Sequence, residues 1–190
     1  MPRPRAQVLT AKWVFKLKLD SAGKPKRFKC RLTARGFMQR PGVHYDRTFA
    51  PTCRMRTFRV LLAEASTDPS IIVRQWDVTC AFLHADIDAQ IYLEQPEGFV
   101  DASKPDHVYL LSKSVYGCKQ ASHLFYEFLR GHLEKIGFKV GKADDCLFTL
   151  RDGDSWMKMC THVDDFCVTS NSDALYKKVW SQLSKVIKLT

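Results

Sequence analysis

The segment THVDDFCV, residues 161–168, constrains the fold of this 190-residue chain more than any other. Its apolar and β-branched flanks favour a half-buried β-strand, yet Asp164 and Asp165 stand in the middle of it. A strand interior rarely tolerates uncompensated carboxylates. A tight turn between two strands would expose both groups, so the segment predicts a hairpin whose tip carries the two aspartates.

A second Asp-Asp dipeptide, Asp144 and Asp145, provides an internal comparison. It follows residues 141–143, Gly-Lys-Ala, at the polar entrance to a predicted strand. Turn aspartates usually lie at such positions, so we predict a structural role for this pair. Asp77, in contrast, is the one acid within the β-rich apolar segment 71–83.

If the strands that carry Asp77, Asp164 and Asp165 are neighbours, their carboxylates converge. Two like charges about 4 Å apart repel by roughly 4 kcal/mol at an effective dielectric of about 20, so convergence requires cations or raised pKa values. Oxygen-only ligands suit Mg²⁺ or Mn²⁺, and two such ions about 4 Å apart support phosphoryl or nucleotidyl transfer. Because many proteins have aspartates in strands, spacing alone leaves a purely structural role open.

The charge balance favours a polyanionic partner. The chain has 30 Lys and Arg against 20 Asp and Glu, a net charge of +10, and sixteen of the basic residues lie in the first 60 positions. Nucleic acid or an anionic membrane surface would fit this charge, while a well-solvated surface is the alternative. No apolar run approaches the 18 residues of a membrane span, and no apolar segment follows Met1, so we predict neither a membrane protein nor a secreted one.

The seven cysteines show no C-x-x-C spacing, which argues against a zinc site. Several lie in apolar runs that resemble strands. We therefore predict that the cysteines are buried free thiols in a reducing compartment.

Hydrophobic periodicity predicts the order of elements. Residues 11–37 alternate apolar and basic side chains around the turn DSAGKP, which is typical of a β-hairpin. Helical periodicity predicts helices at 57–67, at 119–138 and after a capping residue at Ser172 or Asp173. Strands are expected within 71–83, 89–99, 107–115 and 145–170. This order predicts an α+β fold, an antiparallel sheet with helices on one face.

Several motifs in this order resemble the reverse transcriptase of copia-type long-terminal-repeat retrotransposons. They run from KWVFKLKLDSAGKPKRFKCRLTARGFMQRPGVHYDRTFAPT through QWDVTCAFLHADIDAQIYLEQPEGFV and KPDHVYLLSKSVYGCKQA to HVDDFCV, nearly the whole chain. The resemblance implies a right-hand polymerase with an antiparallel ferredoxin-like palm sheet. It places the fingers in residues 1–52 and 87–115, and the palm in residues 53–86 and 116–190.

The same resemblance implies an RNA-directed DNA polymerase that adds deoxynucleotides to a primer 3′-hydroxyl by two-metal nucleotidyl transfer. Asp77, Asp164 and Asp165 would be the catalytic residues. With the carbonyl of Val78 nearby, they would hold two Mg²⁺ ions, for which Mn²⁺ can substitute. The implied partners are an RNA or DNA template-primer, a deoxynucleoside triphosphate and the remainder of the Pol polyprotein, with no membrane partner.

The resemblance also suggests nucleotide-binding residues. Phe82, five residues after Asp77, resembles the aromatic steric gate that disfavours a 2′-hydroxyl, although an ordinary core phenylalanine would fit as well. The motif VYGCKQA resembles the lining of the nucleotide pocket, with Tyr116 and Gly117 nearest the base and sugar.

On the basic hairpin, Lys18 and Lys29 resemble the cations that hold the triphosphate. The register of the hairpin leaves Lys16 and Arg31 as rivals, and solvated lysines are the plain alternative.

The chain departs from the family pattern at several positions. His162 stands where a tyrosine is usual, and Ser122, His123 and Phe125 stand where a proline, an arginine and a tryptophan are usual. Such departures fit either a decaying copy or tolerated variation.

The resemblance places the primer grip, thumb and RNase H beyond Thr190, and integrase upstream. We therefore expect a fragment of a retrotransposon polyprotein with little processive activity alone. A cytoplasmic location in virus-like particles, or a nuclear one, is implied. The main alternative is a non-catalytic nucleic-acid-binding remnant. A metal-dependent phosphatase or nuclease would leave the finger and pocket motifs unexplained.

Overall fold

The computed structural model describes all of residues 1–190 and divides into two compact units. Unit 1 comprises Met1–Thr48 and Ala85–Leu124, and unit 2 comprises Phe49–His84 and Phe125–Thr190. Helices and mainly antiparallel strands make up the chain, so the predicted α+β class is confirmed. None of the helices is both long enough and apolar enough to cross a membrane.

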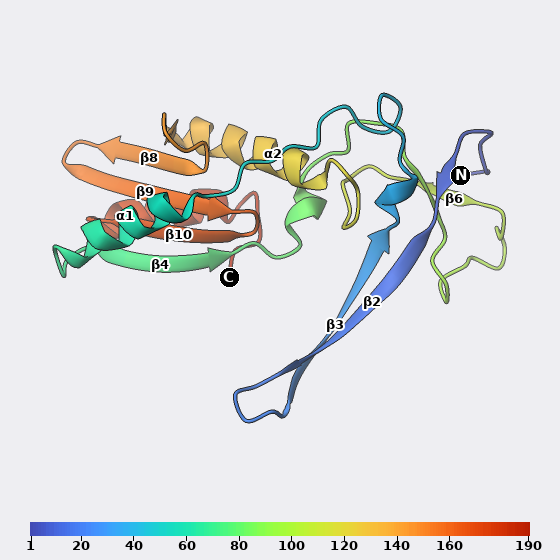
Figure 1. Cartoon of the computed structure of the whole chain (residues 1–190), viewed down its shortest axis with the longest axis horizontal. Helices are drawn as coiled ribbons and strands as arrows, with labels where there is room; N and C mark the ends of the chain where they lie inside the picture. The colour runs from blue at the N-terminus through green and yellow to red at the C-terminus, as the bar shows by residue number, and fades with distance from the viewer. The chain divides into compact units, whose positions relative to one another are not determined.

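The predicted basic hairpin is present in unit 1. Strands β2 (Ala11–Leu19) and β3 (Pro25–Ala34) pair antiparallel and form a long ribbon (Figure 1). Asp20 stabilises the turn because its Oδ1 accepts hydrogen bonds from the backbone N–H groups of Ala22 and Lys24, both at 2.9 Å. An aspartate at the start of a turn commonly makes such bonds, which explains why DSAGKP reverses the chain.

A small second sheet completes unit 1. β1 (Val8–Leu9) runs parallel to β5 (Tyr92–Glu94), which pairs antiparallel with β6 (Val108–Leu110). Leu9, Leu93 and Val108 are buried within it. β5 and β6 fall in segments predicted to be strands, whereas β1 has two residues and shows no periodicity that could predict it.

Unit 2 is built on a five-stranded antiparallel sheet in the order β4-β10-β9-β8-β7. The strands are β4 (Ile72–Asp77), β7 (Lys139–Val140), β8 (Leu147–Asp152), β9 (Ser155–His162) and β10 (Asp165–Ser170). A tight turn joins β8 to β9, with Gly153 at φ 60° directly after Asp152.

The three predicted helices are α1 (Met55–Ser66), α2 (Ala121–Ile136) and α3 (Asp173–Leu183). Ser172, rather than Asp173, is the N-cap of α3, because its hydroxyl accepts a hydrogen bond from the Leu175 N–H at 3.2 Å. A side-chain oxygen at this position satisfies one of the N–H groups that the first turn leaves unpaired.

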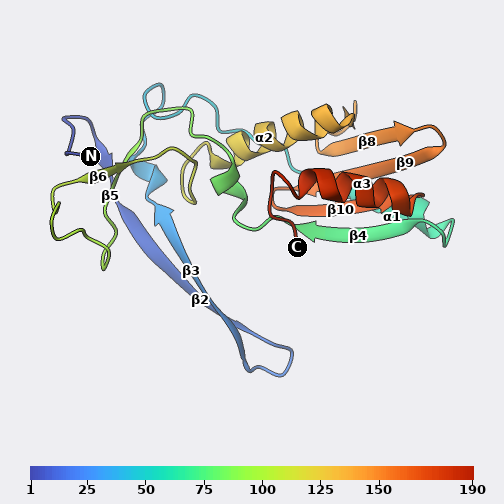
Figure 2. The same ribbon diagram turned by 180° about the vertical axis from the view of Figure 1, so that it is seen from behind.

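The helices of unit 2 do not all lie on one face of the sheet, and that expectation is wrong. The residues of α2 beyond Leu124 and all of α3 pack on Trp76, Phe166 and Val168. α1 lies on the opposite face, as Figures 1 and 2 show from the two sides. The reason is that residues on the other face of the strands, including Val73, Cys160 and Cys167, are also apolar. A helix must therefore pack on that face too.

A disulfide joins Cys53 to Cys160, with 6.2 Å between their Cα atoms. The prediction of free thiols is therefore wrong for these two residues, and burial is wrong for Cys30 and Cys80, which are exposed free thiols. The other three free cysteines are buried or half-buried, as predicted. The pairing links residues 107 positions apart, and sequence spacing could not reveal that their Cα atoms lie within disulfide range.

Candidate active site

The predicted aspartate hairpin is formed by β9 and β10. His162 and Asp165 are the last paired residues, so Val163 and Asp164 make a two-residue turn. The turn lies at the end of the sheet, with Asp165 exposed and Asp164 half-buried. A two-residue turn explains how two carboxylates can interrupt an apolar run without entering the core.

Asp77 lies beside this turn. Asp77 and Asp165 are direct partners across the β4–β10 ladder, so their side chains project from the same face of adjacent strands. The Val78 N–H also donates to the backbone carbonyl of Asp164 at 2.8 Å. The fold therefore brings together the three aspartates singled out in the sequence, although 87 positions separate Asp77 from Asp164 (164 − 77 = 87).

The strand end that carries Asp77 is held on its other side as well. Asp77 exchanges backbone hydrogen bonds with Thr190 at 2.8 and 2.9 Å, and the Thr79 N–H donates to Lys188 at 2.9 Å. Val78, the proposed carbonyl ligand, is 2% exposed and lies opposite Leu189. The backbone of Asp77 is thus fixed by pairing on two sides, so the position from which its side chain projects is well defined.

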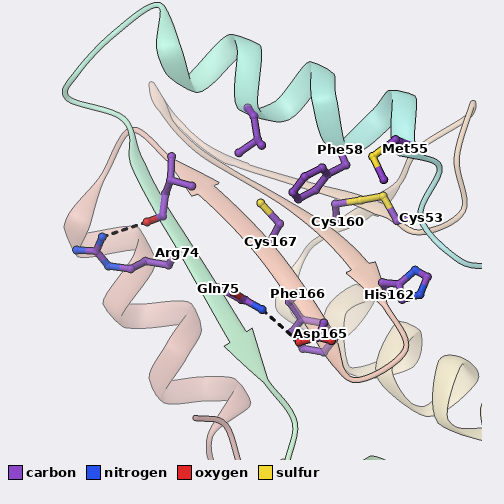
Figure 3. Close-up of a pocket in the computed structure, with 12 residues that line it drawn as sticks. Cys53, Met55, Phe58, Arg74, Gln75, Cys160, His162, Asp165, Phe166 and Cys167 are labelled. Atoms are coloured by element: carbon purple, nitrogen blue, oxygen red, sulfur yellow. Dashed lines mark hydrogen bonds between the residues drawn. A yellow bond between two sulfur atoms is a disulfide. The ribbon is translucent and has the colours of Figure 1, made fainter. Parts of the chain in front are cut away.

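The side chains do not form a closed metal-binding cluster. No group of three or more His, Cys, Asp or Glu side chains is arranged to hold a metal ion. Asp165 Oδ1 accepts a long hydrogen bond from Gln75 Nε2 at 3.3 Å (Figure 3). Asp77 and Asp165 are exposed and share a face, while Asp164 belongs to the turn.

The backbone on both sides of this site is unusual. Val163 has φ 58° and Cys80 has φ 55°, and no other residue except glycine has positive φ. Left-handed backbone is unfavourable for a β-branched residue such as valine, and such strain is concentrated at functional sites. One strained residue precedes Asp164 and the other lies three residues after Asp77, so both mark the same site.

The comparison dipeptide has the structural role that we predicted for its first residue. Asp144 is 5% exposed and binds the start of α1. Its Oδ2 accepts from the Arg54 N–H at 2.9 Å and from the Thr57 hydroxyl at 2.5 Å, and its Oδ1 accepts from the Cys146 N–H at 3.0 Å. Burial raises the pKa of Asp144, but these hydrogen bonds outweigh burial, so the pKa lies below its ordinary value.

We expect Asp144→Ala to destabilise unit 2 by about 3 kcal/mol, because hydrogen bonds to a buried charge are lost and their donors stay unpaired. Asp145→Ala is the matched control, since Asp145 is exposed, and it should leave the melting temperature nearly unchanged. Because the folded pKa is lowered, this stabilisation is present above the unfolded pKa near 3.8 and is lost as pH falls through the folded value. Equal melting curves for the two variants would contradict this role.

The basic residues of the hairpin share one face. Lys16 lies directly opposite Lys29 and Lys18 lies opposite Arg27, while Arg31 is two positions further along β3. Residues at alternate positions of paired strands project to the same side, so Lys18 and Lys29 and both of their rivals lie on one surface. The choice between them does not alter where the positive charge is.

The proposed pocket residues Tyr116 and Gly117 contact the base of this hairpin. The Arg31 guanidinium lies over the Tyr116 ring, 5.2 Å from its centroid, and the Ala34 N–H donates to the Tyr116 carbonyl at 2.8 Å. At Gly117, with φ 91°, an added Cβ would lie 2.0 Å from the Ala34 carbonyl oxygen. An added Cβ at Gly36 would lie 1.9 Å from the Gly117 carbonyl oxygen. Two backbones therefore touch here with no room for a side chain.

Phe82 lies in the short 3₁₀ helix Ala81–His84, which follows the strand of Asp77. Its ring is half-buried and packs against the core of unit 2. This position fits both roles predicted for Phe82, a gate that restricts the sugar and a residue of the core.

Sequence reasoning missed a buried polar cluster in unit 1. Gln120 is fully buried, and its amide donates to the His44 carbonyl at 2.7 Å and to Asp88 Oδ1 at 3.1 Å. Gln39 Nε2 donates to Gln120 Oε1 at 2.9 Å, and Gln39 Oε1 accepts from the Lys119 N–H at 2.7 Å. These bonds position the motif VYGCKQA, and the only signal in the sequence was a glutamine just before an apolar helix.

The departures from the family pattern have different surroundings. Phe125 is 1% exposed and fills the core, so an aromatic ring is retained where the family has tryptophan. His162 is exposed and pairs with Asp165 at the last rung of the hairpin. Neither residue disrupts the local fold.

Comparison with known proteins identifies the family of the chain. The family model for reverse transcriptase (RNA-dependent DNA polymerase) matches residues 2–190. The chain belongs to this family, and its relatives include copia-type retrotransposon Pol polyproteins.

Three relatives show the extent of the similarity. The chain is 39% identical over 184 residues to the retrovirus-related Pol polyprotein from transposon RE2 of Arabidopsis thaliana, a match that covers 97% of the chain and 13% of the relative. It is 38% identical to the RE1 polyprotein of the same plant, with 97% and 12% covered. The TNT 1-94 polyprotein of Nicotiana tabacum is 36% identical, with 93% and 13% covered. The chain therefore spans about an eighth of the length of these curated relatives.

Proposed function

We propose that the chain catalyses RNA-directed DNA synthesis, as the part of a Pol polyprotein that carries the nucleotidyl-transfer site. The observation that carries this proposal is the direct cross-strand pairing of Asp77 with Asp165 beside the strained turn at Asp164. Like charges directly opposite each other destabilise a sheet, so their presence at an exposed strand end favours a functional explanation.

The donor set fits hard divalent cations, because exposed carboxylates of Asp77 and Asp165 share one face and Asp164 lies next to them. Asp77, Asp164 and Asp165, with the Val78 carbonyl, would hold two Mg²⁺ or Mn²⁺ ions. When bound, such ions activate a primer hydroxyl and stabilise the leaving phosphate. The paired backbone around Asp77 fixes the strand end from which this carboxylate projects.

We further propose that the fingers are residues 1–52 and 87–115, which lie mostly in unit 1, and that the ferredoxin-like palm is residues 53–86 and 116–190, which lie mostly in unit 2. The basic ribbon of unit 1 and the antiparallel sheet of unit 2, which carries the aspartates, support this assignment. Lys18, Lys29, Tyr116 and Gly117 would contact the incoming triphosphate, base and sugar, and Phe82 would restrict the sugar. The proposed partners are a template-primer, a deoxynucleoside triphosphate and other Pol segments, in the cytoplasm or nucleus.

A primer-extension assay tests the proposal. A Pol segment that contains this chain should extend a DNA primer on an RNA template when Mg²⁺ and deoxynucleotides are present, and a chelator should stop it. We expect the chain of 190 residues alone to extend primers poorly, because the matched relatives are about eight times longer and positioning errors of about 1 Å can cost about a hundredfold in rate. Failure of the longer segment with Mg²⁺ and with Mn²⁺ would refute the polymerase proposal.

The basic face of the hairpin should bind duplex phosphates through charge. We expect affinity for an RNA–DNA duplex to fall steeply with salt, because bound phosphates release counterions. Combined replacement of Lys16, Lys18 and Arg27 by alanine should weaken binding and lower the slope of log affinity against log salt by about 0.9 for each lost contact. Lys177→Ala on α3 is the control and should leave the slope unchanged. Salt-independent binding would contradict the prediction.

One observation favours the alternative of a nucleic-acid-binding protein without catalysis. The basic face forms within unit 1 from β2 and β3 alone, so it does not require the aspartates of unit 2. Duplex binding without primer extension by the longer segment would support this alternative.

A further inference from the structure

Three cysteines line a cavity of about 530 Å³ between α1 and the sheet of unit 2. Cys53 precedes α1, Cys160 is on β9, and Cys167 is on β10 (Figure 3). Most of the remaining wall is apolar, from side chains such as Met55 and Phe58. The cavity therefore offers a space in which a small sulfur-containing molecule can reach these residues.

The disulfide between Cys53 and Cys160 ties the chain before α1 to β9. Beside it, the Cys53 N–H donates a hydrogen bond to the Thr161 carbonyl at 3.2 Å. The α1 helix is otherwise held to this strand by the ion pair of Glu64 with Lys158, near its other end. Reduction of the disulfide would leave the start of α1 attached to β9 by one backbone hydrogen bond, and the hydrogen bonds of Asp144 with Arg54 and Thr57 would still hold it to the segment before β8.

The two sulfur atoms differ in their surroundings. Cys160 is 3% exposed, whereas Cys53 is half-buried. An external thiolate can therefore attack Cys53 more readily than Cys160, since exchange depends on access to the sulfur that is attacked.

A third cysteine lies beside the disulfide. Cys167 lies opposite Cys160 in the β9–β10 ladder and is a half-buried free thiol. A link between Cys160 and Cys167 is therefore the rival to the pairing of Cys53 with Cys160.

We propose that Cys53 and Cys160 form a reducible disulfide site that exchanges with low-molecular-weight thiols of the glutathione class and fixes the start of α1 to the strand leading into the aspartate turn. Cys160 lies four residues before Asp164, and His162 and Asp165 line the same cavity. The oxidation state of the pair thus sets how firmly one side of the aspartate hairpin is held. The site exists whether or not the chain is a polymerase.

The exchange balances in two steps. An external thiolate bonds to the Cys53 sulfur, the bond between Cys53 and Cys160 breaks, and the Cys160 thiolate leaves. A second external thiolate then attacks the external sulfur of this mixed disulfide and releases the Cys53 thiolate. The protein gains two electrons and, from the two external thiols, two protons, while those thiols become one external disulfide.

Thiol mapping of the whole chain tests the proposal. The protein is equilibrated in glutathione buffers from reducing to oxidising, quenched with acid, alkylated and digested for mass spectrometry. We expect a linked Cys53–Cys160 peptide under oxidising conditions and two alkylated peptides under reducing ones. Free Cys53 and Cys160 at every ratio, or a Cys160–Cys167 link in their place, would overturn the proposal.

Hydrogen exchange on the same samples tests the effect on structure. Reduction should raise exchange about tenfold or more in residues 49–66 and 159–165, and should leave α3 unchanged. Cys53→Ser should match the reduced protein and lose its response to thiols, while Cys30→Ser on the hairpin should respond as the parent does. If Cys53→Ser does not fold, reduction of the parent chain supplies the same comparison. Equal exchange in the oxidised and reduced parent would show that the disulfide does not hold α1.

Discussion

Replacement of Asp77 or Asp164 by asparagine should abolish primer extension by a Pol segment that contains this chain. Asparagine keeps the size of the side chain but removes the charge that would hold a cation at the reacting phosphate. A single electrostatic group at a transition state is typically worth about a hundredfold to a thousandfold in rate, so we expect at least that loss. Single-turnover extension of a labelled primer, with Mg²⁺ in excess, measures the loss directly.

The stability of these variants separates catalysis from folding. Asp77 lies directly opposite Asp165, and like charges in that arrangement destabilise a sheet. Asp77→Asn should therefore melt at the same temperature as the parent or higher, despite its loss of activity. Asp145→Asn, in the other Asp-Asp pair, should retain both properties. Activity within tenfold of the parent in Asp77→Asn would refute its assignment as a catalytic residue.

Gly117→Ala should be the most destabilising single methyl addition in unit 1. The new Cβ would lie 2.0 Å from the Ala34 carbonyl oxygen and 2.7 Å from Thr33 Cγ2, and its backbone has φ 91°. Overpacking against backbone, with the added penalty of left-handed conformation, predicts a loss of about 3–5 kcal/mol. Gly36→Ala should cost a similar amount, because its Cβ would meet the Gly117 carbonyl oxygen at 1.9 Å. Thermal and urea unfolding measure both losses.

The matched control is Gly131→Ala in α2, where an added Cβ would meet nothing within 4 Å. Alanine is favoured over glycine inside a helix, so this variant should gain about 0.5–1 kcal/mol. The comparison also bears on nucleotide binding. If glycine is needed at position 117 only for contact with the sugar or base, Gly117→Ala will have the same melting temperature and urea midpoint as the parent. The close approach to Ala34 would then not explain the need for glycine.

The parts of the fold with local signals were predictable from the sequence. Alternation and the turn DSAGKP predicted the β2–β3 hairpin, and helical periodicity predicted α1, α2 and α3 to within a few residues. The position of two aspartates inside an apolar run predicted the turn at Asp164. It also separated this pair from Asp144, whose polar approach correctly indicated a structural role.

Features that depend on long-range contacts could not be predicted in this way. The disulfide partners are 107 positions apart, and Gln39 meets Gln120 across 81 positions. Neither pair has a local pattern, because each depends on how the chain returns on itself. The location of α1 was also missed, because apolar residues on both faces of β9 and β10 do not say which helix covers each face.

The conformation of Val163 has a consequence for protein engineering. Valine resists φ 58°, so the surrounding ladder, rather than the residue itself, specifies the turn. Design methods that rank residues by local backbone preference would place glycine there and would raise the stability of the hairpin. Such a choice would also give the turn more conformations than the parent sequence allows, and the freedom would appear next to Asp164. A substitution that stabilises this turn for expression would therefore also loosen the position of the Asp164 carboxylate.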